Sequence, residues 1–251
     1  MCIISTGGRC CFTLDQEQFK KVTAMKIGIL QTGHAPEELQ PSLGNYDAMF
    51  ERLLSSGGFT FETFHVVDME FPAGAHAADG WLITGSKHGA YEDHAWIPPL
   101  EALIREIRAA DLPLIGVCFG HQIIAQALGG RVEKFSGGWS IGRTAYQIGP
   151  KTLHLNAWHQ DQVVALPKGA TVEASSDICE NAVLSYGDKV WTIQPHPEFG
   201  AEMIGGLIKY RGSGVVPDAL LNAAQTQLTA SDDSAEIAQM MINVLRGEPA
   251  L

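Results

Sequence analysis

Short runs of apolar residues alternate with amphipathic stretches through the first half of the chain. Continuous apolar runs of this length predict buried strands, and apolar residues at helical spacing predict helices. Strands are predicted at 26–32, within 59–68, at 80–86 and at 112–118. Helices are predicted at 45–58, 96–111 and 121–130. Strands and helices that alternate in this way indicate a parallel sheet with helices on both faces.

From about residue 131 the pattern changes to short β-rich segments separated by turns, such as RTAYQIG, KTLHLN and KVWTIQP. They predict an antiparallel extension, whose last strand, at 189–195, returns to the parallel part of the sheet. The segment from 199 to 247 is predicted to be a helical tail. The prediction is therefore one α/β domain over residues 25–251.

Residues 1–24 form a separate segment of mixed character with no clear period, and the first predicted strand follows Met25 directly. Two interpretations stay open. These residues are either an amino-terminal extension of the native protein, or residues ahead of its natural start at Met25.

The composition limits the classes of function. The 251 residues are 45% apolar, which suffices for a real core. The net charge of −11 argues against nucleic acid as a partner, because nothing would neutralise its phosphates. No apolar run approaches the roughly 20 residues that span a bilayer. The first 24 residues lack a secretory apolar core, and the five cysteines contain no C-x-x-C pair, so a reduced, cytoplasmic setting is expected.

The segment GVCFGHQ, at 116–122, places Cys118 between a predicted strand and a predicted helix. A Gly-x-Cys-x-Gly sequence at such a corner has the form of a nucleophile elbow. The tight turn strains the central residue, and side chains at Gly116 and Gly120 would clash. The amino terminus of the following helix would favour the thiolate of Cys118, and the N–H of Phe119 could face an oxyanion.

A thiolate nucleophile needs a base, and His196 is the favoured candidate among nine histidines. It follows a predicted strand in QPHPEF, between two prolines that restrict the backbone, and Glu198 could orient it. His121 lies in the helix after Cys118 and is expected to face sideways, and His154 fits a packed strand position. On these residues alone, a buried structural cysteine and an incidental loop histidine remain the alternative.

The pair GVCFGHQ and QPHPEF resembles the G-x-C-x-G-x-Q and H-P-E motifs of class I, triad-type glutamine amidotransferases. The likeness extends over residues 26–199. Within the family, the chain is similar to the glutaminase part of GMP synthetase and to γ-glutamyl peptidases. It implies a flavodoxin-like three-layer α/β/α fold and a glutamyl-thioester mechanism. Cys118 would be the nucleophile, His196 the base and then the acid, and Glu198 the group that orients His196.

The resemblance also implies roles for residues around this triad. Backbone N–H groups of Gly85 and Phe119 would form the oxyanion hole, and Gln122 would face the substrate. Trp139, Ser140 and Ile141 match the segment whose backbone holds the α-amino and carboxylate groups. The oxyanion loop departs from the family's usual G-G-P, since it contains Thr84 and Lys87 around Gly85. Lys87 and His88 are interpreted as a solvated turn rather than as substrate contacts.

No metal site and no cofactor are predicted. His154, His159 and Asp161 fit no strong rule for metal-ligand spacing. A structural hydrogen bond between Asp161 and His159 is expected instead, beside the site.

Three hypotheses about function follow. The first is a free-standing enzyme that hydrolyses a γ-glutamyl amide, with glutamine or another small γ-glutamyl compound as substrate. The second is an amidotransferase subunit that delivers ammonia to a separate synthetase partner; it predicts an exposed apolar patch around the site. The third is a catalytically silent binding module. Neither a nucleic acid nor a membrane is an expected partner.

Overall fold

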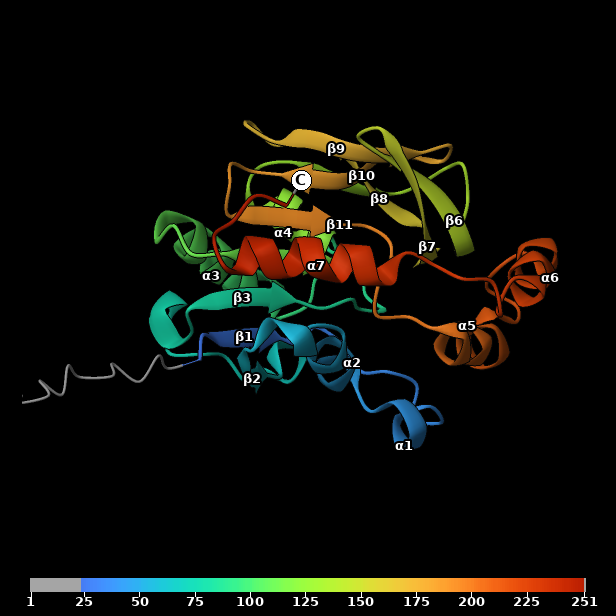
Figure 1. The fold of residues 1–251 in the computed structure, drawn as a ribbon, viewed down its shortest axis with the longest axis horizontal. Helices are drawn as coiled ribbons and strands as arrows, with labels where there is room; N and C mark the ends of the chain where they lie inside the picture. Colours follow the sequence, from blue (N-terminus) through green and yellow to red (C-terminus); the bar gives the residue numbers. More distant parts are fainter. Residues whose placement is uncertain (1–23, 251) are drawn as a thin grey trace, which may run out of the picture.

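The computed structural model describes residues 24–250 (Figure 1). The interpretations of residues 1–24 therefore lie almost wholly outside the described residues. The centre of the fold is a nine-stranded sheet with the strand order β2-β1-β3-β4-β11-β10-β9-β6-β7. The first five strands are mutually parallel and the last four add antiparallel pairs, so the predicted mixed sheet is confirmed.

The parallel part consists of β2 (Thr60–Phe64), β1 (Lys26–Leu30), β3 (Gly80–Ile83), β4 (Leu114–Val117) and β11 (Val190–Ile193). Every residue of the last three strands is buried. Such uninterrupted burial explains why they appear in the sequence as continuous apolar runs, since helices cover both faces. The antiparallel part consists of β10 (Cys179–Ser185), β9 (Thr171–Ser176), β6 (Ser140–Ile148) and β7 (Lys151–His159).

Two of the predicted β-rich segments do not join the main sheet. They form a separate antiparallel pair, β5 (Arg131–Lys134) and β8 (Asp161–Ala165). Val132 and Val163 are buried in the same apolar cluster as the helix that precedes β5, α4 (Phe119–Ala127). Packing against a helix stabilises this two-stranded pair, which would be marginal alone.

The helices form the two outer layers. The described residues contain α1 (Gln40–Leu43), α2 (Tyr46–Leu53), α3 (Ile97–Ala109), α4, α5 (Ala201–Leu207), α6 (Asp218–Thr226) and α7 (Ser234–Leu245). One apolar cluster joins α2 and α7 to one face of the sheet, and a second joins α3 and α4 to the other. Figure 1 shows α7 in front of the sheet and α3 and α4 behind it. The α/β/α expectation is confirmed.

The predicted helical tail divides into parts with different positions. Helices α5 and α6 lie beyond the end of the parallel strands, whereas α7 returns across the sheet (Figure 1). Ile237, Met241 and Leu245 of α7 are fully buried. The last helix of the tail, α7, is therefore part of the core. Within the part of the chain that the structure describes, no helix is long and apolar enough to cross a membrane.

Gly28, in β1, tests how tightly this sheet packs. A Cβ atom at this position would lie 2.3 Å from Cζ3 of Trp81, which is fully buried and donates from Nε1 to the carbonyl of Ala75. We expect Gly28→Ala to lower the free energy of unfolding by about 1–3 kcal/mol, because the ring has no room to move. Urea denaturation measures this change.

Gly205→Ala, in α5, is the matched control. Its Cβ would meet only Leu228 Cδ1, at an ordinary 3.4 Å, so alanine should leave stability unchanged or raise it slightly. Equal stabilities of Gly28→Ala and the wild type would contradict the packing argument.

Candidate functional site

Cys118 occupies a strained corner between β4 and α4. Its backbone has φ 52° and ψ −103°, a conformation that residues other than glycine rarely adopt. A Cβ at Gly116 would lie 2.6 Å from the carbonyl oxygen of Gly120, and one at Gly120 would lie 2.3 Å from that of Ile83. Both glycines are therefore required by close backbone contacts, as the elbow pattern predicts.

Backbone hydrogen bonds hold this corner against the neighbouring strands. The N–H of Cys118 donates to Ile193 in β11 (2.9 Å), and that of Gly120 donates to Thr84 after β3 (3.2 Å). Phe119 begins α4, so its N–H belongs to the amides that no preceding turn satisfies. The positive end of the helix dipole lies beside the sulfur of Cys118.

His196 and Glu198 form a buried pair after β11. His196 Nδ1 lies 2.7 Å from Glu198 Oε1, and the two side chains are only 5% and 1% exposed. The ring of Phe199 stacks on that of His196, with centroids 3.9 Å apart and planes 2° apart. The backbone N–H of His196 donates to Asn156 in β7 (2.8 Å). The imidazole is therefore fixed in position by three independent contacts.

The charge of this pair follows from its surroundings. Burial by itself would lower the pKa of His196. The negative charges of Glu198 and Cys118, with hydrogen bonds to both, outweigh burial and raise the pKa to about 10. The arrangement therefore favours the imidazolium form of His196.

Gly85 brings the third loop to the same place. A Cβ at Gly85 would lie 3.0 Å from His196 Cε1 and 3.7 Å from Cys118 Cβ. The hydroxyl of Thr32, after β1, donates to the carbonyls of Thr84 (2.9 Å) and Gly85 (3.0 Å) and fixes this loop. Loops after β3, β4 and β11 thus meet at the carboxyl edge of the parallel strands, where open α/β sheets bind ligands.

Cys118 and His196 open into a cavity of about 390 Å³. Gln122 and Trp139 also line it, whereas Ser140 and Ile141, at the start of β6, do not. Gln122 is buried, and its Nε2 donates to the carbonyl of Asp161 (2.9 Å) and to Gln194 Oε1 (3.1 Å). The structure thus brings Gln122 and Trp139 to the cavity, whereas Ser140 and Ile141 are not among the residues that line it.

Lys87 and His88 both line the cavity, and Lys87 is exposed to solvent in the loop after β3. Their interpretation as a solvated turn stays a prediction. His121, as expected, faces away from Cys118; its Nδ1 lies 2.8 Å from Thr192 Oγ1 in the core. Burial, and then the nearby His159, lower the pKa of His121 to about 3.

The predicted hydrogen bond between the side chains of Asp161 and His159 is wrong. Both ring nitrogens of His159 are buried without a partner, and burial and then His196 lower its pKa to about 3. Asp161 instead interacts with Tyr91, and burial raises the pKa of its carboxyl. His159 and Asp161 are only two residues apart, but His159 ends β7 and Asp161 begins β8. Their side chains therefore have different surroundings.

Sequence reasoning missed several residues of the cavity wall. Tyr46, from α2, and Arg211, from the turn after α5, both line the cavity. Burial raises the pKa of Tyr46, an effect that Arg211 opposes and Glu198 supports. Tyr46 stacks on Phe199, with centroids 6.0 Å apart. Helical spacing predicted α2, but no sequence signal indicated that its first residue reaches this cavity.

Two groups among the described residues have ligand atoms close enough to hold a metal ion. One consists of His34, His65 and Asp68, and the other of His88, Glu92 and His94. The second group adjoins the cavity, since His88 and Glu92 line it.

The fold and the site define a class of protein: an α/β/α protein with a cysteine at a strained strand–helix corner beside a buried histidine–carboxylate pair. Residues 44–207 match the family described as Glutamine amidotransferase class-I. The chain belongs to this family, which confirms the resemblance of its motifs.

Relatives agree with this assignment, and a solved structure shares the fold. The chain is 31% identical to "Gamma-glutamyl peptidase 3" of Arabidopsis thaliana over 185 residues, which are 67% of this chain and 74% of the relative. It is 33% identical to a glutamine-hydrolysing GMP synthase subunit of Halobacterium salinarum over 54% of this chain and 75% of the relative. The crystal structure of a glutamine amido transferase from Methylobacillus flagellatus superimposes with a TM-score of 0.73 and 22% identity. The match covers 90% of this chain and 96% of that one.

The protonation state of His196 can be tested by its dependence on Glu198. NMR of the histidine ring should show His196 protonated up to about pH 10, with a lower pKa in Glu198→Gln, which removes the carboxylate charge. Since the folded pKa exceeds the unfolded value of about 6.5, this ion contributes full stability below that pH and loses it as the pH rises toward 10.

His121 is the internal reference for this titration, because burial keeps its ring neutral. An unchanged His196 titration in Glu198→Gln would contradict the electrostatic account.

Proposed function

We propose that this protein hydrolyses a γ-glutamyl amide through a glutamyl-thioester on Cys118. One observation carries the proposal: a cysteine held at positive φ at the amino terminus of α4 shares a cavity with His196, which is paired with the buried Glu198. Family membership supports hydrolase chemistry on a glutamine-type substrate. The roles of the individual residues are part of the proposal.

The reaction begins when the Cys118 thiolate attacks the γ-carbonyl carbon, and the carbonyl electrons move to oxygen. N–H groups of Phe119 and Gly85 stabilise this oxyanion. His196 then gives its proton to the departing nitrogen, the carbon–nitrogen bond breaks, and ammonia or an amine leaves with a thioester behind. Water attacks the thioester while His196 takes one of its protons. The thiolate leaves, releasing the γ-carboxyl of glutamate.

Glu198 acts on this sequence through His196. Its 2.7 Å contact with Nδ1 directs Nε2 toward the reacting atoms and stabilises the imidazolium form. On the substrate side, Gln122 and the Trp139–Ile141 segment, including Ser140, hold the glutamyl part. Trp139 and Gln122 line the cavity, which supports their part of this proposal. The backbone roles of Ser140 and Ile141 rest on the family resemblance alone. The wall also carries Lys87 and Arg211, which suit an anionic substrate.

The second candidate is an amidotransferase subunit that passes ammonia to a separate synthetase. It has a specific observation in its favour: Tyr91 and Val215 line the cavity yet are 47% and 62% exposed. Exposed apolar groups at the mouth of a site suit a partner's surface. The similarity to a GMP synthase subunit supports the same candidate.

A catalytically silent binding module is the third candidate. Covalent labelling of Cys118 distinguishes it from the free-standing hydrolase.

The domain organisation is part of the same proposal. Residues 25–251 form one amidotransferase domain that includes the helical tail. Support comes from α7, whose apolar residues pack in the cluster that contains Cys118.

Covalent labelling tests the γ-glutamyl pocket directly. We expect a diazoketone analogue of glutamine to form one adduct, on Cys118, because the pocket orients it against an activated thiolate. Intact mass and peptide mapping identify the modified residue. Cys179 is an internal control, since burial raises the pKa of its thiol to about 12.

Cys118→Ser should give no adduct and no turnover while its melting temperature stays near the wild-type value. Absence of an adduct on the folded wild-type protein would contradict a free-standing hydrolase and favour the partner-dependent enzyme or the silent module.

The ranking of His196 and Glu198 gives a kinetic prediction. His196→Asn should lower kcat/KM for a γ-glutamyl amide by about 10³-fold, because it removes the proton carrier. Glu198→Gln should lower it by a smaller factor, since orientation is secondary to proton transfer. His154→Asn is the matched control and should leave the rate unchanged. Equal losses in the first two variants would overturn the assigned roles.

A further inference from the structure

The loop between β3 and α3 carries three ligand-type side chains within seven residues: His88, Glu92 and His94. The two histidine rings each bring one nitrogen close to the same carboxylate oxygen. Glu92 Oε2 lies 3.4 Å from His88 Nδ1 and 2.7 Å from His94 Nε2. The two imidazole rings have centroids only 4.2 Å apart. A tetrahedral zinc ion with metal–ligand bonds near 2.0–2.1 Å holds its ligand atoms about 3.3 Å apart. The observed separations lie close to that spacing.

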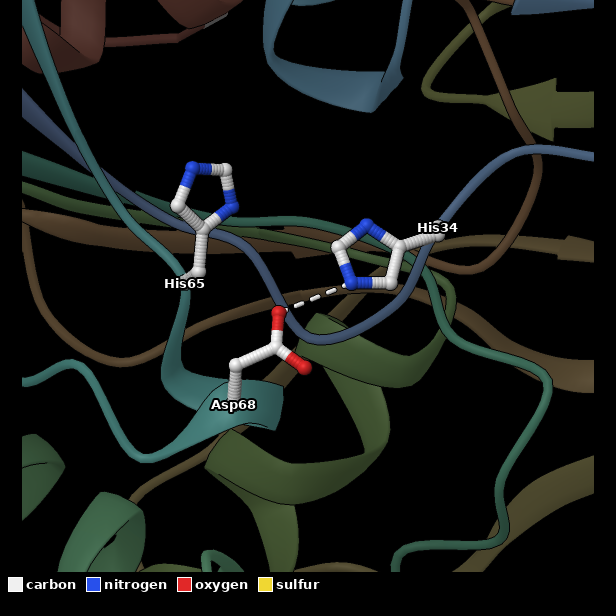
Figure 2. Close-up of side chains that lie close together, drawn as sticks. All are labelled: His34, His65 and Asp68. Atoms are coloured by element: carbon white, nitrogen blue, oxygen red, sulfur yellow. Dashed lines mark hydrogen bonds and ion pairs between the residues drawn. The ribbon is translucent and has the colours of Figure 1, made fainter. Parts of the chain in front are cut away.

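The cluster of His34, His65 and Asp68 provides an internal comparison (Figure 2). His34 Nε2 lies 2.9 Å from Asp68 Oδ2. In both clusters, all three ligand atoms lie within 4.8 Å of one another. However, Asn45 Oδ1 accepts from the N–H groups of Ala35 and Tyr46, which turns Nδ2 of Asn45 toward His34 Nδ1 (2.9 Å). That contact makes Nδ1 an acceptor and keeps the proton of His34 on Nε2, the atom that faces Asp68.

Gln31 restrains His65 in the same way. Gln31 Oε1 accepts from the N–H of Asp47, which identifies the other end of the amide as Gln31 Nε2. Gln31 Nε2 lies 3.1 Å from His65 Nδ1 and 3.2 Å from His34 Nδ1. Both histidines are thus fixed as hydrogen-bond acceptors by amide donors. The second nitrogen of a metal-binding histidine almost always donates to an acceptor, which is the opposite of the arrangement at His34. Proximity alone does not separate the two clusters, but these amide contacts do.

The loop cluster carries no such restraint. Glu92 can only accept, so the hydrogen of His94 lies on Nε2 in the metal-free protein. His94 is about one-third exposed, and water can carry that proton to Nδ1 when a metal takes its place. The ring of His94 stacks on that of Trp96 at 5.8 Å with planes 9° apart, which limits its movement without using either nitrogen.

We propose that His88, Glu92 and His94 bind a divalent transition-metal ion of the zinc class. The site lies at the wall of the cavity into which Cys118 opens, because His88 and Glu92 line that cavity. Three protein ligands leave a coordination position for water or for an anionic group of a molecule in the cavity. The inference is independent of the proposed hydrolysis, since metal binding needs no turnover.

Cobalt titration of the full chain tests the site. Chelator-treated protein is titrated with Co²⁺, whose visible absorption reports coordination, and calorimetry with Zn²⁺ gives the stoichiometry and affinity. We expect one ion per chain. Glu92→Gln and His94→Asn should each weaken binding by about tenfold or more, since each removes a ligand without changing the size of the side chain greatly. Melting temperatures establish that both variants fold.

Asp68→Asn is the matched control, because it makes the same carboxylate-to-carboxamide change in the other cluster; binding should be unchanged. Cys118→Ser tests the competing thiolate and should also bind normally. Failure of the folded wild type to bind, or normal binding by both loop variants, would overturn the proposal. So would loss of binding in Asp68→Asn, or a sulfur-to-cobalt charge-transfer band that disappears in Cys118→Ser.

Discussion

The contact of α4 with the end of β3 is the constraint on which the site depends. Gly120 lies so close to the carbonyl of Ile83 that no Cβ fits between them. This approach draws the first turn of the helix over the sheet and forces Cys118, at the start of that turn, to positive φ. A strained conformation of this kind costs about 1–3 kcal/mol and persists only where its surroundings hold it. Here hydrogen bonds to Thr84 and Ile193 hold it from both neighbouring strands.

The antiparallel part of the sheet supports the chemistry of the parallel part. Asn156, in β7, accepts the backbone N–H of His196 and fixes the turn after β11. Trp158 and His159, in the same strand, form part of the cavity wall. The buried Glu198 and His196 compensate each other's charge, which neither could carry alone at this depth. The extension therefore both positions the proposed base and encloses the space in front of it.

The loop from Lys87 to His94 distinguishes this cavity chemically. It contributes Lys87, His88 and Glu92 to the cavity wall, and Arg211 and Tyr46 contribute from other elements. Family membership indicates the type of reaction, whereas residues of the cavity wall decide which molecules fit the site. His88 and Glu92 belong both to this wall and to the proposed metal site.

The sequence by itself determined which segments form the parallel strands and where the two motifs lie, because both depend on local patterns. Continuous apolar runs predicted β3, β4 and β11, and the glycines around Cys118 predicted the corner. Only the tertiary structure decided that Tyr46, Lys87 and Arg211 share a cavity with Cys118, since they come from distant elements. It also separated β5 and β8 from the main sheet and left His159 without its expected partner. Local patterns specify which face of an element is apolar, but long-range packing alone decides which side chains meet.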